Sequence, residues 1–225
     1  MQKSSLEQTP AGPPRGLVVY SLLAVLAATA LGIYVHLNPL PPFDLALSLG
    51  VQSWRAPWLD SLMIGVSLFG WFPWSLIFTL GMGLLLAWWR GVRLGGYFVL
   101  IVALQGALST LIKLVSHRPR PTDPPVWVYR VEFGTSYPSG HVMQYVVTFG
   151  FLLWLAWAYL PSGWLRRVAI LLCGLAIGLV GLSRIYLGAH WFTDVVGGYL
   201  LGSVFLGWAI YFARRYALPG PSPRD

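Results

Sequence analysis

The chain has 225 residues, of which 56% are hydrophobic and only 10% are charged. This composition excludes an ordinary soluble domain and predicts a polytopic membrane protein of the all-α class, with one membrane domain and no room for a soluble one. The net charge of +8 does not indicate nucleic-acid binding, because the basic residues stand singly or in pairs between apolar runs. Cys173 is the only cysteine, which excludes an intramolecular disulfide and a cysteine zinc site.

Six membrane spans are predicted, with a polar tail before them over residues 1–15 and a proline-rich tail after them over residues 217–225. The first apolar run has no evident small-residue cleavage site, so we expect it to remain as a helix. The run from Ser61 to Trp89 is uncharged. It is too short for two spans and long for one, so we expect Gly70 and Pro73 to kink it. The six spans are expected over residues 16–36, 61–89, 94–116, 141–159, 164–182 and 190–212.

Together the spans make one six-helix bundle domain over residues 16–216. Residues 43–54 are expected to form a short interfacial helix, and residues 118–137 a polar, proline-rich loop. The fifth and sixth spans each carry a pair of glycines four residues apart, which predicts close packing of these two helices. The pairs are Gly174 with Gly178 and Gly198 with Gly202.

Three short polar stretches stand at the edges of the predicted spans. They are K-x6-R-P from Lys113 to Pro121, P-S-G-H from Pro138 to His141, and S-R-x5-H-x3-D from Ser183 to Asp194. Together they provide cations, imidazoles, a carboxylate and a Ser-Gly turn. Phosphoryl transfer needs such a set, because its transition state spreads negative charge over three equatorial oxygens. In order and in internal spacing, these motifs resemble those of the type 2 phosphatidic acid phosphatase (PAP2) superfamily, which comprises integral-membrane lipid phosphatases and the vanadium haloperoxidases.

The motif cations Lys113, Arg120 and Arg184 are the expected phosphate ligands, since Arg offers a planar donor fork and Lys a point charge. Ser139 and Gly140 open a predicted helix, where backbone N–H groups bind anions. The resemblance implies that these two residues also donate to phosphate oxygens. A plain helix cap would account for Ser139 but not for the histidine that follows at position 141.

The resemblance also assigns the catalytic roles. His190 is implied to be the nucleophile that forms a phosphohistidine, with Asp194 orienting its ring. If a helix runs through both residues, their spacing of four puts them on one face. His141 is implied to protonate the leaving oxygen and later to activate water. No metal or other cofactor is expected, because no Asp/Glu cluster accompanies this pair and the motif cations repel a divalent ion.

Several residues beside the motifs have simpler expected roles. Arg118 and Arg130 are expected to be interface residues, and so is His117, although it lies at the edge of the site. Trp191 is expected to wall the pocket. Most other tryptophans are expected in interfacial belts.

The distribution of Lys and Arg predicts the orientation. With the three motif cations set aside, nine basic residues lie in the tails and the loops on their side, against three on the other side. Both tails are therefore expected in the cytoplasm, and the motifs at the outer face of the cell (inner or plasma) membrane.

The topology indicates a phosphorylated lipid as substrate. The resemblance suggests undecaprenyl pyrophosphate first, then phosphatidylglycerophosphate, phosphatidic acid or a lipid A phosphate. A lipid phosphotransferase with the same site is one alternative, and a non-catalytic lipid transporter or binding protein is an alternative of another class. A soluble haloperoxidase disagrees with the predicted spans. The sequence leaves the oligomeric state open.

Overall fold

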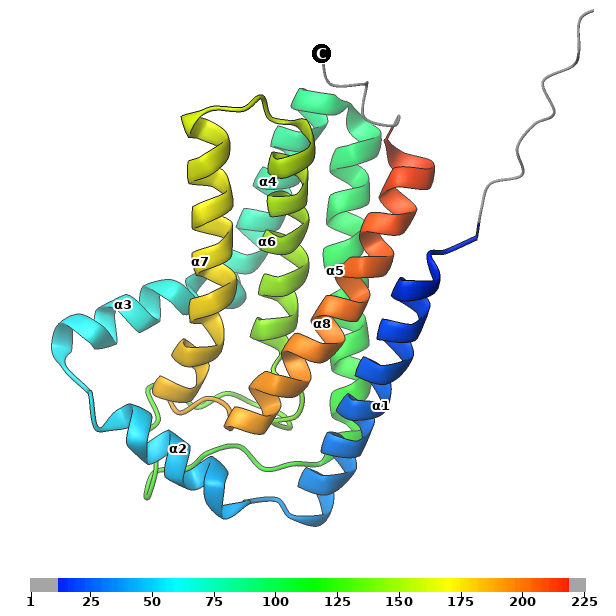
Figure 1. Ribbon diagram of the computed structural model, residues 1–225. Helices are drawn as coiled ribbons and strands as arrows, with labels where there is room; N and C mark the ends of the chain where they lie inside the picture. Colours follow the sequence, from blue (N-terminus) through cyan, green and yellow to red (C-terminus); the bar gives the residue numbers. More distant parts are fainter. Residues whose placement is uncertain (1–11, 219–225) are drawn as a thin grey trace, which may run out of the picture.

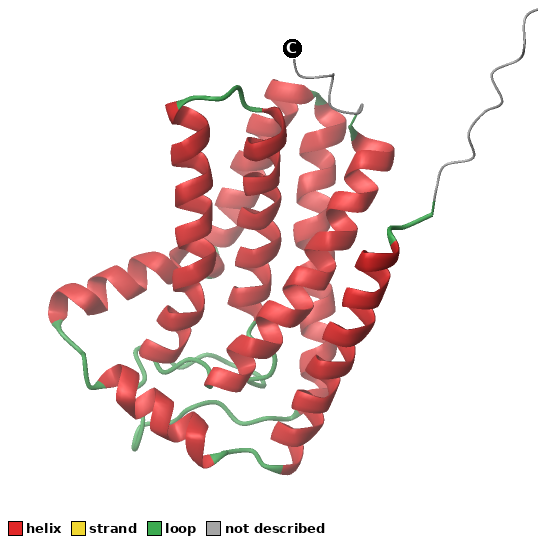
Figure 2. Ribbon diagram, in the orientation of Figure 1, coloured by secondary structure: helices red, strands yellow, loops and turns green. Residues whose placement is uncertain are grey.

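The computed structural model describes residues 12–218, and within this range the chain is helical, with no strand (Figure 2). The all-α prediction is confirmed. The elements are α1 (Arg15–Leu37), α2 (Pro42–Gln52), α3 (Pro57–Ser67), the 3-10 turn η1 (Leu68–Gly70), α4 (Trp74–Arg90), α5 (Val92–Ser116), α6 (Gly140–Tyr159), α7 (Trp164–Tyr186), α8 (Phe192–Phe212) and the π-helical turn η2 (Ala213–Ala217).

Five helices, α1, α5, α6, α7 and α8, are long and apolar enough to cross a membrane. The second predicted span, over residues 61–89, is broken, because Pro57–Gly70 and Trp74–Arg90 meet at an angle of 59°. The kink predicted at Gly70 and Pro73 is confirmed, and it divides the run into two separate helices. The predicted short helix after the first span is also present, as α2.

Helix α6 is the centre of the bundle. It packs against α5, α7 and α8, while α4 lies along α5 and α1 lies along α8 (Figure 1). In α6, 61% of the most apolar window is buried, compared with 28% or less in the other four spans. The P-S-G-H motif lies at the N-terminal end of this central helix, so its polar residues are inside the protein.

The predicted packing of α7 on α8 through small residues is wrong. Gly174 and Gly178 are exposed, and a Cβ atom at either would meet no atom within 4 Å. Gly198 and Gly202 instead face α6, where added Cβ atoms would approach its side chains at 2.9 and 3.1 Å. The glycines of α8 thus allow a close approach to the central helix.

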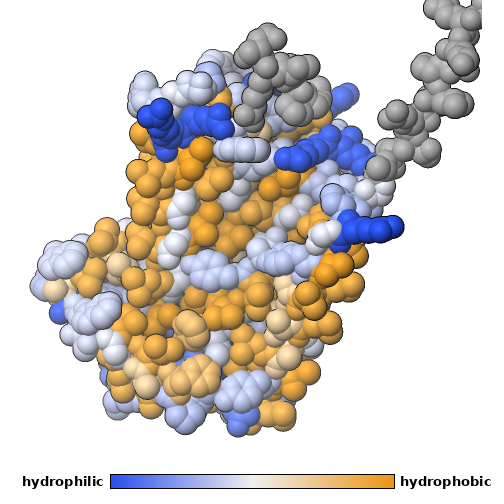
Figure 3. Space-filling model, in the orientation of Figure 1, coloured by the Kyte–Doolittle hydropathy of each residue, from blue (hydrophilic) through white to orange (hydrophobic). Residues whose placement is uncertain are grey.

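The face of the molecule in Figure 3 is largely apolar along the helices, as a lipid-facing wall requires, and hydrophilic surface gathers at the end that holds the end of α8. The start of α1, the α4–α5 connection and the α6–α7 connection lie toward that same end, and α2 crosses the opposite end (Figure 1). Of the predicted tails over residues 1–15 and 217–225, residues 1–11 and 219–225 lie outside the described residues.

Candidate active site

The three motifs meet at the end of the bundle that α2 crosses (Figure 1). Lys113 is in the last turn of α5, Ser139 directly precedes α6, and Arg184 is in the last turn of α7. His190 lies in the short connection between α7 and α8, and Asp194 in the first turn of α8. Residues distant in sequence are thus gathered at one level of the bundle.

Buried polar atoms without partners mark the centre of this site. Within the described chain, Ser139 Oγ, His141 Nε2 and Arg184 Nε are buried and make no hydrogen bond. Such groups are rare and cost about 1–3 kcal/mol each. Ser139 is the N-cap residue of α6, yet its hydroxyl makes no capping hydrogen bond, so a plain helix cap does not account for it. A phosphate bound here would give these three groups partners.

The ring of His190 is buried, with 1% of its surface exposed, and its two nitrogens face different partners. Nδ1 lies 3.4 Å from Asp194 Oδ2 and 3.4 Å from Ser136 Oγ. Nε2 lies 3.2 Å from Nη1 of Arg120. Because a guanidinium only donates, Nε2 is the acceptor and the ring proton belongs on Nδ1, facing the carboxylate.

The charge state of His190 follows from the same surroundings. Burial lowers the pKa of His190 well below its usual value, and the positive charges of Arg120, Lys113 and Arg184 add to this effect. The imidazole is therefore neutral, with a lone pair on Nε2 available to attack.

The expected helix through His190 and Asp194 does not exist, because α8 begins at Phe192. The two side chains meet because the connection folds back, with the backbone N–H of Trp191 donating to Asp194 Oδ2 at 2.9 Å. The Trp191 indole donates to the carbonyl of Pro119 at 3.0 Å. Trp191 thus anchors the loop that follows α5 to the connection between α7 and α8.

Asp194 is held by a buried ionic network that the sequence did not reveal. Arg118 Nη1 donates to Asp194 Oδ1 at 2.5 Å, and Arg118 Nη2 donates to Asp44 Oδ2, also at 2.5 Å. Ser136 Oγ donates to the other oxygen of Asp194 at 2.5 Å. The three charged side chains are fully buried. The expectation that Arg118 is an interface residue is therefore wrong, because this residue ties α2 to α8.

Two of the three motif cations, Arg120 and Arg184, share one carboxylate, that of Glu132 in the loop before α6. Arg120 Nη1 donates to Glu132 Oε2 at 3.1 Å, and Arg184 Nη2 forms an ion pair with Glu132 Oε1. The indole of Trp71 donates to the same Oε1 at 3.0 Å. Burial alone would raise the pKa of the Glu132 carboxyl, but the charge of Arg184 and the smaller effects of the other groups around it, including the Trp71 hydrogen bond, together hold that pKa well below its usual range.

Lys113 completes the cation set. Its ammonium donates to the carbonyl of Thr135 at 3.0 Å, so it lies beside the loop that carries Glu132. A Cβ atom at Gly140 would lie 3.1 Å from Ser109 Oγ and 3.9 Å from Lys113 Cε. A glycine at position 140 therefore lets the start of α6 approach α5 at the level of the lysine.

The break between α3 and α4 forms another wall of the site. A Cβ atom at Gly70 would lie 2.0 Å from Cδ2 of His141, so any larger residue there would displace the imidazole. Trp71 stands edge-on to the His141 ring, with centroids 5.9 Å apart. The kink that the sequence predicted thus brings two residues against an imidazole on another helix.

Sequence reasoning missed Asp44, Glu132 and Ser136, and gave Arg118 the wrong role. One available signal was scarcity, because the whole chain has only seven acidic residues. A carboxylate next to a membrane needs a partner. Asp44 is 0% exposed, and Glu132 has 15% of its side chain exposed. A single sequence does not show which arginines Asp44 and Glu132 contact. The part of the chain that the structure describes contains no group of three or more His, Cys, Asp or Glu residues arranged to hold a metal ion.

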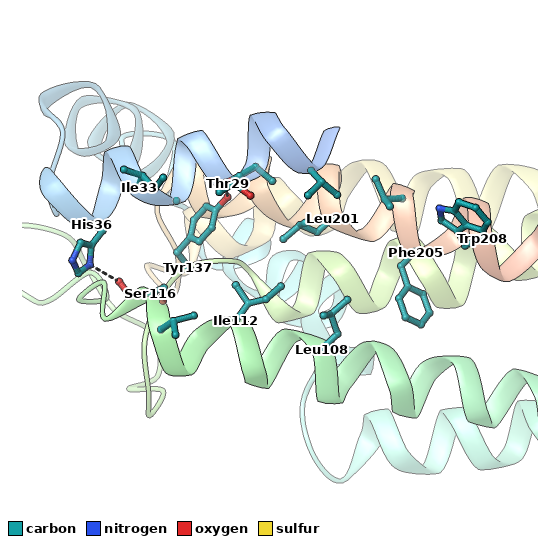
Figure 4. Close-up of a pocket in the computed structure, with 15 residues that line it drawn as sticks. Thr29, Ile33, His36, Leu108, Ile112, Ser116, Tyr137, Leu201, Phe205 and Trp208 are labelled. Atoms are coloured by element: carbon teal, nitrogen blue, oxygen red, sulfur yellow. Dashed lines mark hydrogen bonds between the residues drawn. The ribbon is translucent and has the colours of Figure 1, made fainter. Parts of the chain in front are cut away.

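An apolar groove of about 660 Å³ runs beside the site between α1, α5 and α8 (Figure 4). His36 and Ser116 lie at one end of it, and Trp208 lies at the other (Figure 4). Tyr137 lines the groove two residues before Ser139, and its hydroxyl donates to the carbonyl of Ala28 at 2.5 Å. Tyr137 in the loop before α6 therefore borders the groove, while Ser136 and Ser139 of the same loop lie at the polar site.

A family model described as the PAP2 superfamily matches residues 94–217, which include all three motifs. The chain belongs to the PAP2 superfamily. The resemblance inferred from the motifs is confirmed.

Individual PAP2 relatives agree with this assignment. The chain is 31% identical over 171 residues to phosphatidylglycerophosphatase B of Bacillus subtilis, covering 75% of this chain and 82% of that protein. It is 29% identical over 170 residues to an undecaprenyl-diphosphatase of Sulfolobus acidocaldarius, covering 72% and 73%.

Two crystal structures have the same fold. A transmembrane PAP2-type phosphatidylglycerolphosphate phosphatase from Bacillus subtilis superposes with a TM-score of 0.78 at 26% identity, covering 88% of this chain and 97% of that one. Aquifex aeolicus LpxE superposes with a TM-score of 0.58 at 22% identity, covering 74% and 94%, which shows the fold alone. This chain is thus a membrane protein with the PAP2 architecture.

Proposed function

We propose that this PAP2 protein hydrolyses the terminal phosphate of a membrane lipid through a phosphohistidine at His190, without a metal. The observation that carries the proposal is the placement of His190 Nε2, which lies 3.2 Å from Nη1 of Arg120 at a site rich in buried, unpartnered donors. A nucleophile beside fixed phosphate-binding cations is the arrangement that phosphoryl transfer requires.

In the first step, the lone pair on Nε2 attacks phosphorus, and the bond from phosphorus to the lipid oxygen breaks. Positive charge then develops on the ring, and Asp194 stabilises it from the Nδ1 side. His141 enters this step as an imidazolium and donates one proton to the leaving oxygen, which leaves His141 neutral and lets the lipid depart as an alcohol or as a lipid phosphate. Arg120, Arg184 and Lys113 balance the charge on the phosphoryl oxygens, and Ser139 and Gly140 donate to them.

In the second step, water attacks the phosphohistidine. His141, now without its proton, accepts one from that water, the P–N bond breaks, and inorganic phosphate leaves. Both histidines return to their starting state. A lipid acceptor in place of water would make the protein a phosphotransferase, so release of free phosphate distinguishes the two activities.

The apolar groove supports a lipid substrate. It follows α1 from Val25 to His36, which is about 16 Å at the rise of an α-helix. Ile33 and Val115 line it and are themselves exposed, by 57% and 71%, so a hydrocarbon chain can enter from the bilayer. We propose that the groove binds the hydrocarbon chain of the substrate. The phosphate would then lie past Tyr137, beside Ser139 and His190.

Relatives named for two lipid phosphates support two candidate substrates. Undecaprenyl pyrophosphate is the lipid that the family resemblance suggested first, and the Sulfolobus relative is named for this activity. Phosphatidylglycerophosphate is the lipid for which a Bacillus relative and a Bacillus crystal structure are named. Both lipids present a terminal phosphate on a long hydrocarbon anchor, as the site and the groove require.

The Lys/Arg distribution supports an active site at the outer face and cytoplasmic termini. In a Cys173→Ser background, Asp123→Cys should react with an impermeant maleimide in intact cells, and Arg167→Cys should react only after lysis. Both positions are exposed, one in the loop beside the site and one at the α6–α7 end. The reverse labelling pattern would invert the orientation.

The test of the proposed function is phosphate release by purified protein in detergent with EDTA, on both lipids and on phosphatidic acid. Release that persists in EDTA and vanishes in His190→Ala supports the proposal and ranks the substrates. Loss of activity in EDTA that magnesium restores would contradict the metal-independent mechanism. Binding without release, in folded protein, would favour a non-catalytic lipid-binding protein.

A further inference from the structure

The carboxylate of Glu132 holds donors that the substrate phosphate needs. Its Oε2 accepts from Arg120 Nη1 at 3.1 Å, and that same nitrogen lies 3.2 Å from Nε2 of His190. Its Oε1 pairs with Arg184 and accepts from the indole of Trp71. The two oxygens of one carboxylate thus bridge the two arginines of the motifs, directly beside the proposed nucleophile.

A phosphoryl group in line with His190 requires these same two guanidinium groups for its equatorial oxygens. Glu132 occupies Nη1 of Arg120 and Nη2 of Arg184, so a phosphate that binds these two groups must displace the carboxylate, while Nε of Arg184 is left for phosphate in either state. Glu132 is also a full anion, because the charge of Arg184 holds the pKa of its carboxyl well below the usual range.

We propose that Glu132 is an internal competitor for the phosphate site, and that it makes the enzyme selective for dianionic terminal phosphates over phosphodiester headgroups. This inference rests on the proposed function, since it concerns how the same site chooses its ligand.

The segment around Glu132 is built so that its carboxylate can leave. In the described chain, the nearest backbone–backbone hydrogen bonds on either side of it are made by the N–H groups of Tyr129 and Ser136. The neighbouring side chains of Val131 and Phe133 are 77% and 96% exposed. Gly134 and Thr135 are held by hydrogen bonds from the side chains of Arg120 and Lys113. The ion pairs of Glu132 therefore attach only the short segment over residues 131–133, where a stronger anion can replace the carboxylate.

Charge explains why such a competitor discriminates between lipids. A phosphodiester headgroup carries one negative charge, as Glu132 does, so replacing Glu132 by this headgroup adds no electrostatic attraction to the two arginines. It also brings a bulky second ester group into the site. A terminal phosphate carries up to two negative charges and three free oxygens, so it interacts more strongly with the arginines than a carboxylate. The tether also gives Glu132 a high effective concentration, which matters in a bilayer where phosphodiester headgroups are abundant.

The first experiment measures binding of inorganic phosphate at pH 8 to the purified full chain by calorimetry, for wild type and Glu132→Gln. If Glu132 occupies the site about nine-tenths of the time, its removal tightens the dissociation constant for phosphate about ten-fold. The matched control is Asp123→Asn, which removes an exposed carboxylate from the same loop and should leave phosphate affinity unchanged. Equal or weaker phosphate binding by Glu132→Gln would overturn the proposal.

The second experiment tests selectivity with dioctanoyl phosphatidylglycerol, a phosphodiester, as inhibitor of phosphate release. We expect strong inhibition of Glu132→Gln and little inhibition of wild type or Asp123→Asn. Equal inhibition of all three proteins would contradict the selectivity role. If Glu132→Gln fails to fold, Glu132→Asp replaces it, because its shorter side chain keeps the loop charge but does not span both arginines. If no lipid is hydrolysed, the proposed function fails, while the phosphate-binding experiment still decides whether Glu132 competes.

Discussion

Gly70 touches the imidazole of His141 so closely that an added Cβ atom would lie 2.0 Å from Cδ2 of that ring. The break between α3 and α4 is therefore part of the wall of the proposed active site. The proposed general acid is held from one side by a backbone segment with no side chain, and any side chain at position 70 must push the imidazole away.

Gly70→Ala should lower the turnover number at least about 100-fold, the cost expected when a catalytic group is misplaced by about 1 Å. The matched control is Gly65→Ala in α3, where an added Cβ atom meets nothing within 4 Å and activity should be preserved. Phosphate release and thermal unfolding are measured on both proteins. Normal turnover by Gly70→Ala would show that catalysis does not depend on the position of the His141 imidazole seen in the structure.

Arg118→Met should destabilise the protein strongly, because it leaves the buried carboxylates of Asp44 and Asp194 without their shared cation. Removing one partner from such a network costs about 3–5 kcal/mol. Arg93→Gln, which removes an exposed arginine at the start of α5, is the control and should change the unfolding free energy by less than about 0.5 kcal/mol. Equal unfolding free energies for the two variants would mean that the network is not a stabilising element.

Much of this architecture was predictable from the sequence, because hydropathy and charge have a direct physical meaning in a bilayer. The spans, the kink at Gly70 and Pro73, and the gathering of the motifs at one end follow from where apolar runs stop. The network of Arg118 with Asp44 did not follow, because ion pairs between distant residues leave no periodic pattern. The packing of Gly198 on α6 instead of α7 was also out of reach, since a small-residue face does not name its partner.

The apolar groove gives a prediction that depends on chain length. Leu201→Trp adds bulk to the groove wall contributed by α8, so it should raise KM for a long-chain lipid phosphate and leave KM for a dioctanoyl analogue nearly unchanged. Leu84→Trp is the control, at an exposed position of α4 outside the groove. Steady-state kinetics measure KM for both substrates. An equal change in KM for both chain lengths would show that the groove does not bind the hydrocarbon chain.

The protonation state of His190 gives a prediction in pH. A group whose pKa is lowered by folding stays neutral as the pH falls through its ordinary value, so His190 should remain neutral at pH 6.5 and become protonated only below it. Histidine-selective ¹⁵N NMR measures this directly, because the chain has four histidines and His190→Gln assigns the signal. A titration midpoint at or above pH 6.5 would contradict the neutral nucleophile.

The most direct test of the account is to trap the covalent intermediate. Protein mixed with a ³²P-labelled lipid phosphate and quenched in alkali, where phosphohistidine survives, should carry label that maps to the peptide containing His190. The label should be absent from His190→Ala and lost on acid treatment. Efficient turnover with no labelled peptide, or label retained in His190→Ala, would contradict the claim that His190 is the nucleophile.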